Sequence, residues 1–190
     1  MTAGDDPRPT LTIDLDGVIC APPFGVNLGV GRRFLDPDAP PVAARVPPRW
    51  LSAPLDRIRF GVRRPLPEAR EALAALSELR RVVVLTGRRT SPRRWMERHG
   101  LDRYVDEIVV NDGPLASAHF KLRCAQELDA VEHIDDDGAT AQLLAERSNV
   151  AVYVRDWPRN RGLPYASNVT RVAHLGELAQ RLGSSRVDET

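Results

Sequence analysis

The stretch LTIDLDGVIC, residues 11–20, decides the fold of this chain and contains its first candidate site residues. Its opening residues are apolar and rich in Ile, Leu and Thr, which predicts a short buried strand. Asp14 and Asp16 lie where that strand should end, and side chains at i and i+2 of an extended chain point the same way. Gly17 then allows the backbone to turn. Two neighbouring carboxylates are costly without a cation or a shared proton, so the pattern indicates a metal site, an acid–base pair or both; an acidic turn is the alternative.

The composition is that of an ordinary globular protein. The chain has 190 residues, which predicts one domain with an insertion. Its formal net charge is +1, so no overall field favours nucleic acid or a membrane surface. Cys20 and Cys124 are too few for a disulfide framework, and we expect two reduced thiols in a cytoplasmic protein. Residues 1–9 fit neither a signal peptide nor a membrane span, so we expect a loose lead-in.

Lys121 is the only lysine among the 27 basic residues. A general bias toward arginine accounts for most of this pattern, and chance survival of one lysine is the plain alternative. The functional interpretation is that Lys121 occupies a position where an ammonium group is needed and a guanidinium group would not serve.

Residues 21–65 differ in character from the rest of the chain. They are rich in Pro, Gly and Arg and show no regular period, which predicts an irregular insertion with short strands or one helical turn around Trp50–Ile58. A solvated surface is the simpler explanation for each arginine alone, but as a group they would attract an anionic ligand. These arginines are Arg32, Arg33, Arg45, Arg49, Arg57, Arg59, Arg63 and Arg64.

Beyond the insertion, short apolar strands alternate with helices, which predicts βαβ units and a parallel sheet covered on both faces. Ligands of such sheets bind beyond the carboxyl ends of the strands. The unusual groups lie there: Asp14 and Asp16, Thr86-Gly87, and the run Asp135–Asp137. The predicted helices span residues 67–80, 91–99, 116–128, 138–147 and 175–182, and the predicted strands span 82–85, 108–110, 131–134, 150–154 and 168–172.

The order of these motifs resembles that of the haloacid dehalogenase superfamily of phosphatases. The resemblance covers the chain from about Leu11 to Val154 and includes Asp-x-Asp-Gly-Val at Asp14, Leu-Thr-Gly-Arg at residues 85–88, Lys121, and Ile-Asp-Asp at residues 134–136. It implies an α/β, Rossmann-like three-layer sandwich with a central parallel sheet. The implied core comprises residues 10–20 and 66–183, with a small cap inserted at 21–65 and flexible termini at 1–9 and 184–190.

The resemblance also implies catalytic roles. Asp14 would be the nucleophile that forms an aspartyl-phosphate, and Asp16 would be the general acid–base. Thr86 would bind the phosphoryl oxygens, with the backbone N–H of Gly87 close by. Lys121 would neutralise charge between the nucleophile and the phosphoryl group, which would account for the single lysine.

Mg²⁺ is the cofactor that the resemblance implies. Asp14, Asp135 and the backbone carbonyl of Asp16 would hold the ion, which prefers oxygen ligands. Asp136 would ligate through a water or orient the site. The acidic triplet has a second explanation as a helix N-cap, for which Asp137 is best placed.

The presence of Asp16 favours a phosphatase over a dehalogenase, because an alcohol leaving group must be protonated and a halide need not be. Residues 156–160, Asp-Trp-Pro-Arg-Asn, are similar to a segment of the 5′(3′)-deoxyribonucleotidase branch. We therefore expect a small anionic substrate, first a nucleoside monophosphate and next a sugar phosphate or another phosphoester. Two alternatives stay open: a polynucleotide 3′-phosphatase, which the near-neutral charge disfavours, and a non-catalytic protein that binds a phosphoryl ligand. The sequence predicts no membrane partner and no particular oligomeric state.

Overall fold

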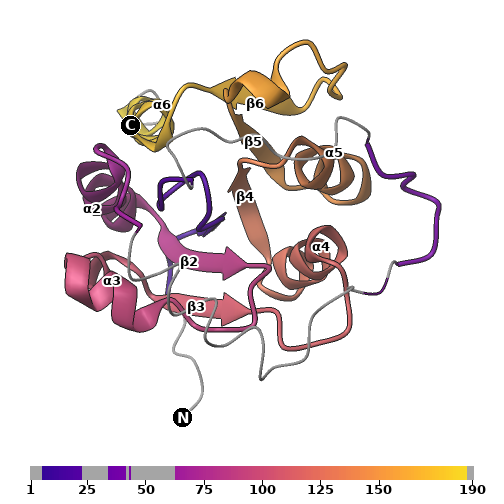
Figure 1. Cartoon of the computed structure of the whole chain (residues 1–190). Coiled ribbons are helices and arrows are strands. Elements are labelled where there is room, and N and C mark those ends of the chain that lie inside the picture. Colours follow the sequence, from indigo (N-terminus) through magenta and orange to yellow (C-terminus); the bar gives the residue numbers. More distant parts are fainter. Residues whose placement is uncertain (1–5, 23–33, 42, 44–62, 188–190) are drawn as a thin grey trace.

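Six parallel strands form the centre of the fold (Figure 1). The structure is a computed structural model, and it describes residues 6–22, 34–41, 43 and 63–187. The strands lie in the order β3-β2-β1-β4-β5-β6, and each neighbouring pair is parallel. The predicted parallel sheet is therefore confirmed. Its strands are β1 (Thr10–Ile13), β2 (Arg81–Thr86), β3 (Glu107–Val110), β4 (Ala130–Asp135), β5 (Ala151–Arg155) and β6 (Val169–Val172).

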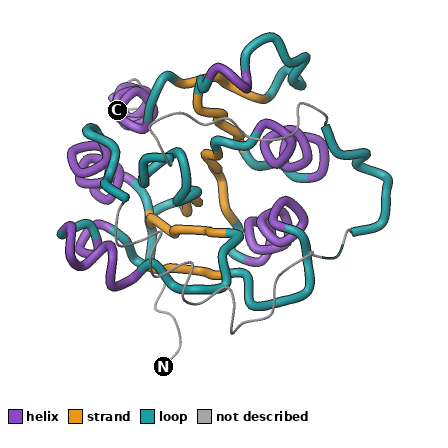
Figure 2. Tube along the Cα trace, in the orientation of Figure 1, coloured by secondary structure: helices purple, strands orange, loops and turns teal. Residues whose placement is uncertain are grey.

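Helices cover both faces of the sheet and complete three layers (Figure 1). Figure 2 shows the strands passing between the two groups of helices. One group comprises α2 (Ala69–Leu79), α3 (Arg93–His99) and α6 (Leu175–Val187), and the other comprises α4 (Ser117–Glu127) and α5 (Gly138–Arg147). Two single turns of 3₁₀-helix, η2 (Asp102–Tyr104) and η3 (Pro158–Asn160), lie in the loops. The α/β fold class predicted from the sequence is thus confirmed.

Strands β1 and β2 are buried on both faces, as in a parallel sheet covered by helices. Leu11 and Ile13 of β1 are fully buried, and so are residues 82–85 of β2. On one face the core continues into the first group of helices through side chains such as Leu73. On the other face a second cluster, which includes Leu144, packs between α5 and β5. Burying a leucine or isoleucine side chain contributes about 1.5–3 kcal/mol, so these contacts fix the strands that carry the site.

Strand β1 lies where the order of the sheet reverses. Ile13 pairs with Val84 of β2 on one side and with Ile134 of β4 on the other. The three strands therefore end at nearly the same level, and the loops that follow them meet at one edge. In open α/β sheets this switch point is the usual place for a ligand.

Two helix ends follow their sequence signals. Gly100 ends α3 with φ of +61°, a left-handed conformation that glycine adopts without steric cost. Asp137 precedes α5, and its carboxylate accepts a hydrogen bond from the backbone N–H of Thr140 at 3.1 Å. The cap explanation of the acidic triplet thus holds for Asp137, which leaves Asp135 and Asp136 to face the edge of the sheet.

The last helix is longer than the sequence pattern predicts. The pattern predicts an end at Leu182 and a loose tail from residue 184, but α6 continues to Val187. The hydroxyl of Ser184 donates to the backbone oxygen of Gln180 at 3.0 Å. Ser184 therefore lies within the helix. The prediction ended too early because the last residues of α6 are mostly polar and the pattern of apolar side chains stops before them.

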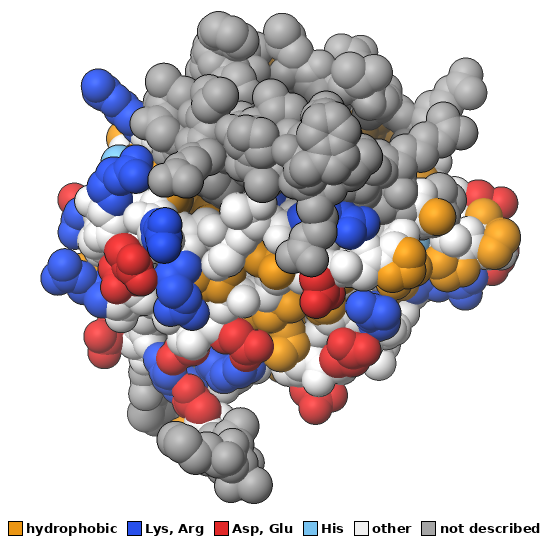
Figure 3. All heavy atoms as spheres, turned by 60° about the horizontal axis from the view of Figure 1, so that its bottom comes forward, with side chains coloured by type: hydrophobic (Ala, Val, Ile, Leu, Met, Phe, Trp, Pro, Cys, Tyr) orange, Lys and Arg blue, Asp and Glu red, His pale blue; other side chains and the backbone are white. Residues whose placement is uncertain are grey.

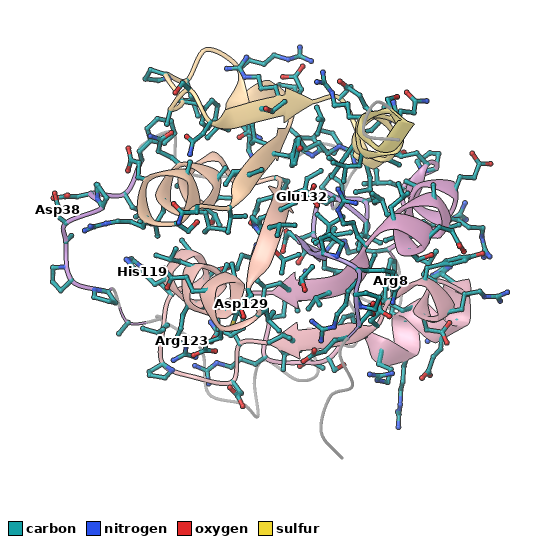
Figure 4. All side chains as sticks on the ribbon, turned by 180° about the vertical axis from the view of Figure 1, so that it is seen from behind. Arg8, Asp38, His119, Arg123, Asp129 and Glu132 are labelled. Carbon is teal, nitrogen blue, oxygen red and sulfur yellow. The ribbon has the colours of Figure 1, made fainter. Side chains whose placement is uncertain are left out.

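The described parts of the insertion contact two separate places on the core. Its final residues return beside β1, where Pro65 forms an antiparallel bridge with Cys20 and Leu66 donates to the backbone oxygen of Ile19 at 2.9 Å. Residues 34–41 lie along α5, where Arg147 pairs with Asp38 at 2.8 Å. Figure 4 labels Asp38 on this segment, beside that helix.

The domain boundaries implied by the resemblance stay a prediction. The expected turn around Trp50–Ile58 and six of the insertion arginines lie outside the described residues, as do residues 1–5 and 188–190 of the termini. The six are Arg32, Arg33, Arg45, Arg49, Arg57 and Arg59.

Candidate active site

Asp14 follows the last residue of β1, and its backbone N–H donates to the oxygen of Ile134 at 2.9 Å. Its side chain is buried, and Oδ1 lies 2.7 Å from Nζ of Lys121. Lys121 is buried on α4 and also donates to Oδ2 of Asp135 at 2.7 Å. The single lysine of the chain therefore lies between two carboxylates from neighbouring strands.

Three buried carboxylates form one cluster at this edge. One oxygen from each of Asp14, Asp135 and Asp136 lies within 4.8 Å of the others. Burial raises the pKa of Asp14 to about 7, and Asp135 and Asp16 add to the rise while Lys121 opposes it. Burial and the neighbouring Asp14 likewise raise the pKa of Asp136. The ammonium group of Lys121 contacts two of the three carboxylates, and Arg159 lies 3.2 Å from Oδ1 of the third, Asp136. Oxygen ligands in this number suit a hard divalent cation, so the cluster fits Mg²⁺.

Asp135 differs from its two neighbours in the cluster. Burial opposes its ionisation, but the charge of Lys121 and a hydrogen bond from His133 outweigh this and lower the pKa of Asp135. Its other oxygen, Oδ1, accepts from the backbone N–H of Asp137 at 2.8 Å. Asp135 is therefore held as a carboxylate on both oxygens.

Asp16 faces two guanidinium groups rather than the carboxylate cluster. Arg88 donates from Nε to Oδ2 at 2.5 Å and from Nη2 to Oδ1 at 2.8 Å, and Nη1 of Arg63 also binds Oδ1. Burial opposes ionisation, but the hydrogen bond and charge of Arg88 together with Arg63 lower the pKa of Asp16. The expected convergence with Asp14 is therefore incomplete, because β1 ends at Ile13 and the extended alternation does not continue to Asp16. The Asp16 side chain is 32% exposed, whereas Asp14 and Asp135 are buried.

Thr86 and Gly87 lie at the same edge, at the end of β2. Thr86 is 1% exposed, and its hydroxyl oxygen accepts from the backbone N–H of Arg88 at 3.3 Å. A Cβ at Gly87 would overlap the hydroxyl oxygen of Ser117 at the start of α4. Glycine fits this contact because it has no Cβ.

His133 supports the cluster from within the sheet, and sequence reasoning missed it. Its ring is fully buried, with Nε2 3.2 Å from Oδ2 of Asp135 and Nδ1 2.8 Å from the hydroxyl of Thr12. An ionised carboxylate only accepts, so Nε2 carries a proton and donates to Asp135. The hydroxyl of Thr12 also lies 3.2 Å from the backbone oxygen of Glu132. Residues 133 and 135 alternate along one strand and share a face, a signal that the sequence contains.

Two arginines at Asp16 were also missed as individual site residues. Arg88 follows Thr86-Gly87 directly, so its place beside the strand end could have been inferred. Arg63 is one of eight arginines in the predicted insertion, and nothing local distinguishes it from its neighbours. Its position is set by tertiary contacts, since its Nε donates to the oxygen of Ala21 at 2.6 Å and its own carbonyl accepts from Nε1 of Trp95 at 2.9 Å.

Solved structures similar to this one share its sheet and its layers. A hydrolase of the haloacid dehalogenase superfamily from Geobacter sulfurreducens matches with a TM-score of 0.58 and 19% identity, over 93% of this chain and 97% of that one. A phosphatase of the same superfamily from Thermococcus onnurineus matches with a TM-score of 0.61 and 12% identity, over 93% and 98%. The D,D-heptose 1,7-bisphosphate phosphatase of B. bronchiseptica, solved with magnesium and phosphate, matches with a TM-score of 0.54 and 15% identity, over 93% and 99%.

The chain is thus an α/β protein with a buried acidic cluster at the switch point of its sheet, and it has the fold of the haloacid dehalogenase superfamily. No protein-family model matches the sequence, and no curated protein does so. Among the described residues, no helix is both long and apolar enough to pass through a bilayer. The resemblance noted from the motifs is therefore confirmed at the level of the fold.

Replacing the buried lysine tests whether its charge holds the carboxylates together. Lys121→Met leaves Asp14 and Asp135 without their ammonium partner, so we expect the free energy of unfolding to fall by about 3 kcal/mol in urea titrations. Added Mg²⁺ should recover part of the loss by supplying positive charge. Arg123→Met, at an exposed position of the same helix, is the control and should change stability by about 0.5 kcal/mol or less. Equal stability of the two variants would contradict this role.

Proposed function

We propose that this chain is a hydrolase, and specifically a Mg²⁺-dependent phosphatase that acts on a small phosphomonoester through an aspartyl-phosphate at Asp14. The observation that carries the proposal is the contact of one ammonium group with two carboxylates beside a third, at the switch point of the sheet. The fold is one on which phosphatases are known, including the magnesium- and phosphate-bound heptose bisphosphatase.

The proposed first step transfers the phosphoryl group to the protein. An oxygen of Asp14 attacks phosphorus and the bond from phosphorus to the leaving oxygen breaks. Asp16 gives that oxygen a proton, which the carboxylate must first take up from solvent as it leaves Arg88 and Arg63. Lys121, Thr86 and the Gly87 N–H would bind the phosphoryl oxygens and hold them in line. Mg²⁺ held by Asp14, Asp135, Asp136 and the Asp16 carbonyl would neutralise charge on the phosphoryl oxygens.

The proposed second step releases phosphate. Asp16 takes a proton from water, the water oxygen attacks phosphorus, and the bond to Asp14 breaks. The exposure of the Asp16 carboxylate suits this double role, because a leaving group and then a water must each reach it. Arg63 and Arg88 would hold the Asp16 carboxylate that remains after the first step.

The proposed substrate is a small anionic phosphomonoester. A nucleoside monophosphate is the first expectation, from the similarity of residues 156–160 to the deoxyribonucleotidase segment, and a sugar phosphate is the second. A panel of both types, with an aryl phosphate as a generic substrate, would rank them by kcat/KM.

Loss of the nucleophile should abolish turnover. We expect phosphate release that requires Mg²⁺, stops in EDTA, and falls by about a thousandfold or more in Asp14→Asn. The variant changes one charged oxygen to an amide and keeps the size of the side chain. Absence of turnover of every phosphoester by folded, Mg²⁺-loaded wild-type protein would contradict the proposal and favour a non-catalytic ligand-binding role.

The role of Asp16 predicts a dependence on the leaving group. An alkoxide must be protonated as it leaves, whereas an aryl oxide is a weaker base and leaves more readily without a proton. Asp16→Asn should therefore lower kcat/KM, which reports the phosphoryl transfer to Asp14, by about a hundredfold or more for alkyl phosphates, and lower it less for p-nitrophenyl phosphate. An equal loss of kcat/KM for both substrates would argue that Asp16 acts on charge or structure and not as the acid.

A second candidate function, a phosphatase of polynucleotide ends, is favoured by one surface. Helix α3, the turn η2 that follows it, and the segment at residue 64 expose an arginine surface, defined here as Arg64, Arg93, Arg94, Arg98 and Arg103. The segment at residue 64 lies against α3, because Trp95 of α3 donates to the backbone oxygen of Arg63. None of the five forms an ion pair with another described residue, although Glu97 lies among them. Figure 3 shows basic side chains gathered on the side of α2 and α3, with some acidic ones between them. A phosphate backbone would complement this surface.

Salt dependence separates this candidate from the small-molecule phosphatase. If polynucleotides bind the arginine surface, single-stranded oligonucleotides should bind less tightly as salt rises. The triple variant Arg93→Ser, Arg94→Ser, Arg98→Ser should then reduce the slope of log K against log salt by about 0.7 for each of these arginines that binds a phosphate group. The control carries Arg123→Ser, Arg171→Ser and Arg181→Ser on other elements. Fluorescence anisotropy that shows no binding, or an equal loss of affinity in both triple variants, would exclude the candidate.

A further inference from the structure

The segment after β5 lies against the candidate active site. It comprises residues 155–160, Arg-Asp-Trp-Pro-Arg-Asn, and is called here the β5 brace. It begins at the last residue of β5 and includes the turn η3. Four of its side chains bind backbone oxygens of the loops after β1 and β4, which carry the proposed site residues. The sequence suggests a nucleotidase-like segment here, but these contacts give it a second role that needs no nucleotide.

Three N–H groups of the brace donate to one oxygen, the backbone carbonyl of Asp136. Arg159 donates from Nη2 at 2.6 Å and from Nε at 3.2 Å, and Asn160 donates from Nδ2 at 2.9 Å. Nη2 of Arg159 also lies 3.2 Å from Oδ1 of the Asp136 carboxylate. Asn160 is buried, and its Nδ2 donates in addition to the oxygen of Arg155 at 2.8 Å. The amide therefore has a fixed orientation.

The other end of the brace holds the loop after β1. Trp157 donates from Nε1 to the oxygen of Gly17 at 2.9 Å, and Nη1 of Arg155 donates to the same oxygen at 3.2 Å. The guanidinium group of Arg155 also lies 4.7 Å from the centre of the Trp157 ring and pairs with Glu68 at 2.8 Å. The brace thus connects the backbone at Gly17 with the backbone at Asp136.

Gly17 and Asp136 also touch each other directly. A Cβ at Gly17 would overlap Oδ2 and Cγ of Asp136, and Gly17 has φ of +75°. The carboxylate is therefore confined by backbone on one side and by Arg159 on the other. Since Asp14, Asp135 and Asp136 repel one another as anions, a carboxylate without such confinement would turn away from the cluster.

We propose that the β5 brace positions the Asp136 carboxylate toward a divalent cation, with Arg159 and Asn160 as positioning residues. This inference rests on the proposed function, because it requires a cation bound by the acidic cluster. Groups that orient a metal ligand from behind change metal affinity by about 10–100-fold when they are removed. The charge of Arg159 by itself would have the opposite effect on affinity, because removing a positive charge from the site would strengthen cation binding.

The test uses Mg²⁺ alone as the probe. The Mg²⁺-dependent rise in Tm of the full chain gives an apparent Mg²⁺ affinity for the wild type, Arg159→Met, Asn160→Ala and Arg161→Met. Arg159→Met and Asn160→Ala should each weaken this affinity about tenfold or more. Arg161→Met is the matched control, because Arg161 is the next arginine in the chain and pairs with Asp156 at 3.1 Å. Each variant is compared with its own cation-free Tm, so a loss of stability does not obscure the result.

The outcomes separate this proposal from the proposed function. A wild type without any Mg²⁺-dependent change in Tm would contradict the proposed function and this inference together. A normal wild-type response with unchanged or tighter Mg²⁺ binding in either Arg159→Met or Asn160→Ala would overturn the brace alone. Arg159→Lys keeps the positive charge but offers a single ammonium group in place of the guanidinium group. It should recover part of the Mg²⁺ affinity that is lost in Arg159→Met.

Discussion

The ammonium group of Lys121 is the interaction on which the site depends. Its Nζ lies 2.7 Å from an oxygen of Asp14 and 2.7 Å from an oxygen of Asp135, and all three groups are buried. A carboxylate pair taken out of water without a cation would be strongly unfavourable. Burial alone would lower the pKa of the lysine, but the two carboxylates outweigh this and raise it, so Lys121 is held in its ammonium form.

The sheet brings these ions together because it is parallel and reverses its order at β1. Asp14 follows one strand and Asp135 ends its neighbour, so the register of β1 with β4 places them side by side. The loops that follow could still separate. Residues 155–160 bind the backbone of both loops, which makes the fold beyond β5 part of the site and not only a cover for the edge of the sheet.

The sequence predicted most of the fold and the proposed site residues, because each motif directly follows an apolar run and parallel strands end at the same edge of the sheet. Asp14, Thr86 and Asp135 each end or follow an apolar run, and their meeting follows from topology alone. The helix cap at Asp137 was also predictable from its chemistry. Contacts between long side chains and distant parts of the chain were not predictable. The residues around Arg63 and Asn160 in the sequence do not indicate which carbonyl or carboxylate each side chain binds. The continuation of α6 to Val187 was missed because polar residues complete it.

The central claim is that Asp14 forms a covalent bond with phosphorus. Acid quenching during turnover preserves an acyl phosphate, and mass spectrometry of the digested protein would locate it. The account predicts one added phosphoryl group on the peptide that contains Asp14. With p-nitrophenyl phosphate as substrate, its level should rise when Asp16 is replaced by Asn, because hydrolysis slows more than formation. Phosphate release with no modified peptide, or with the group on another residue, would contradict the account.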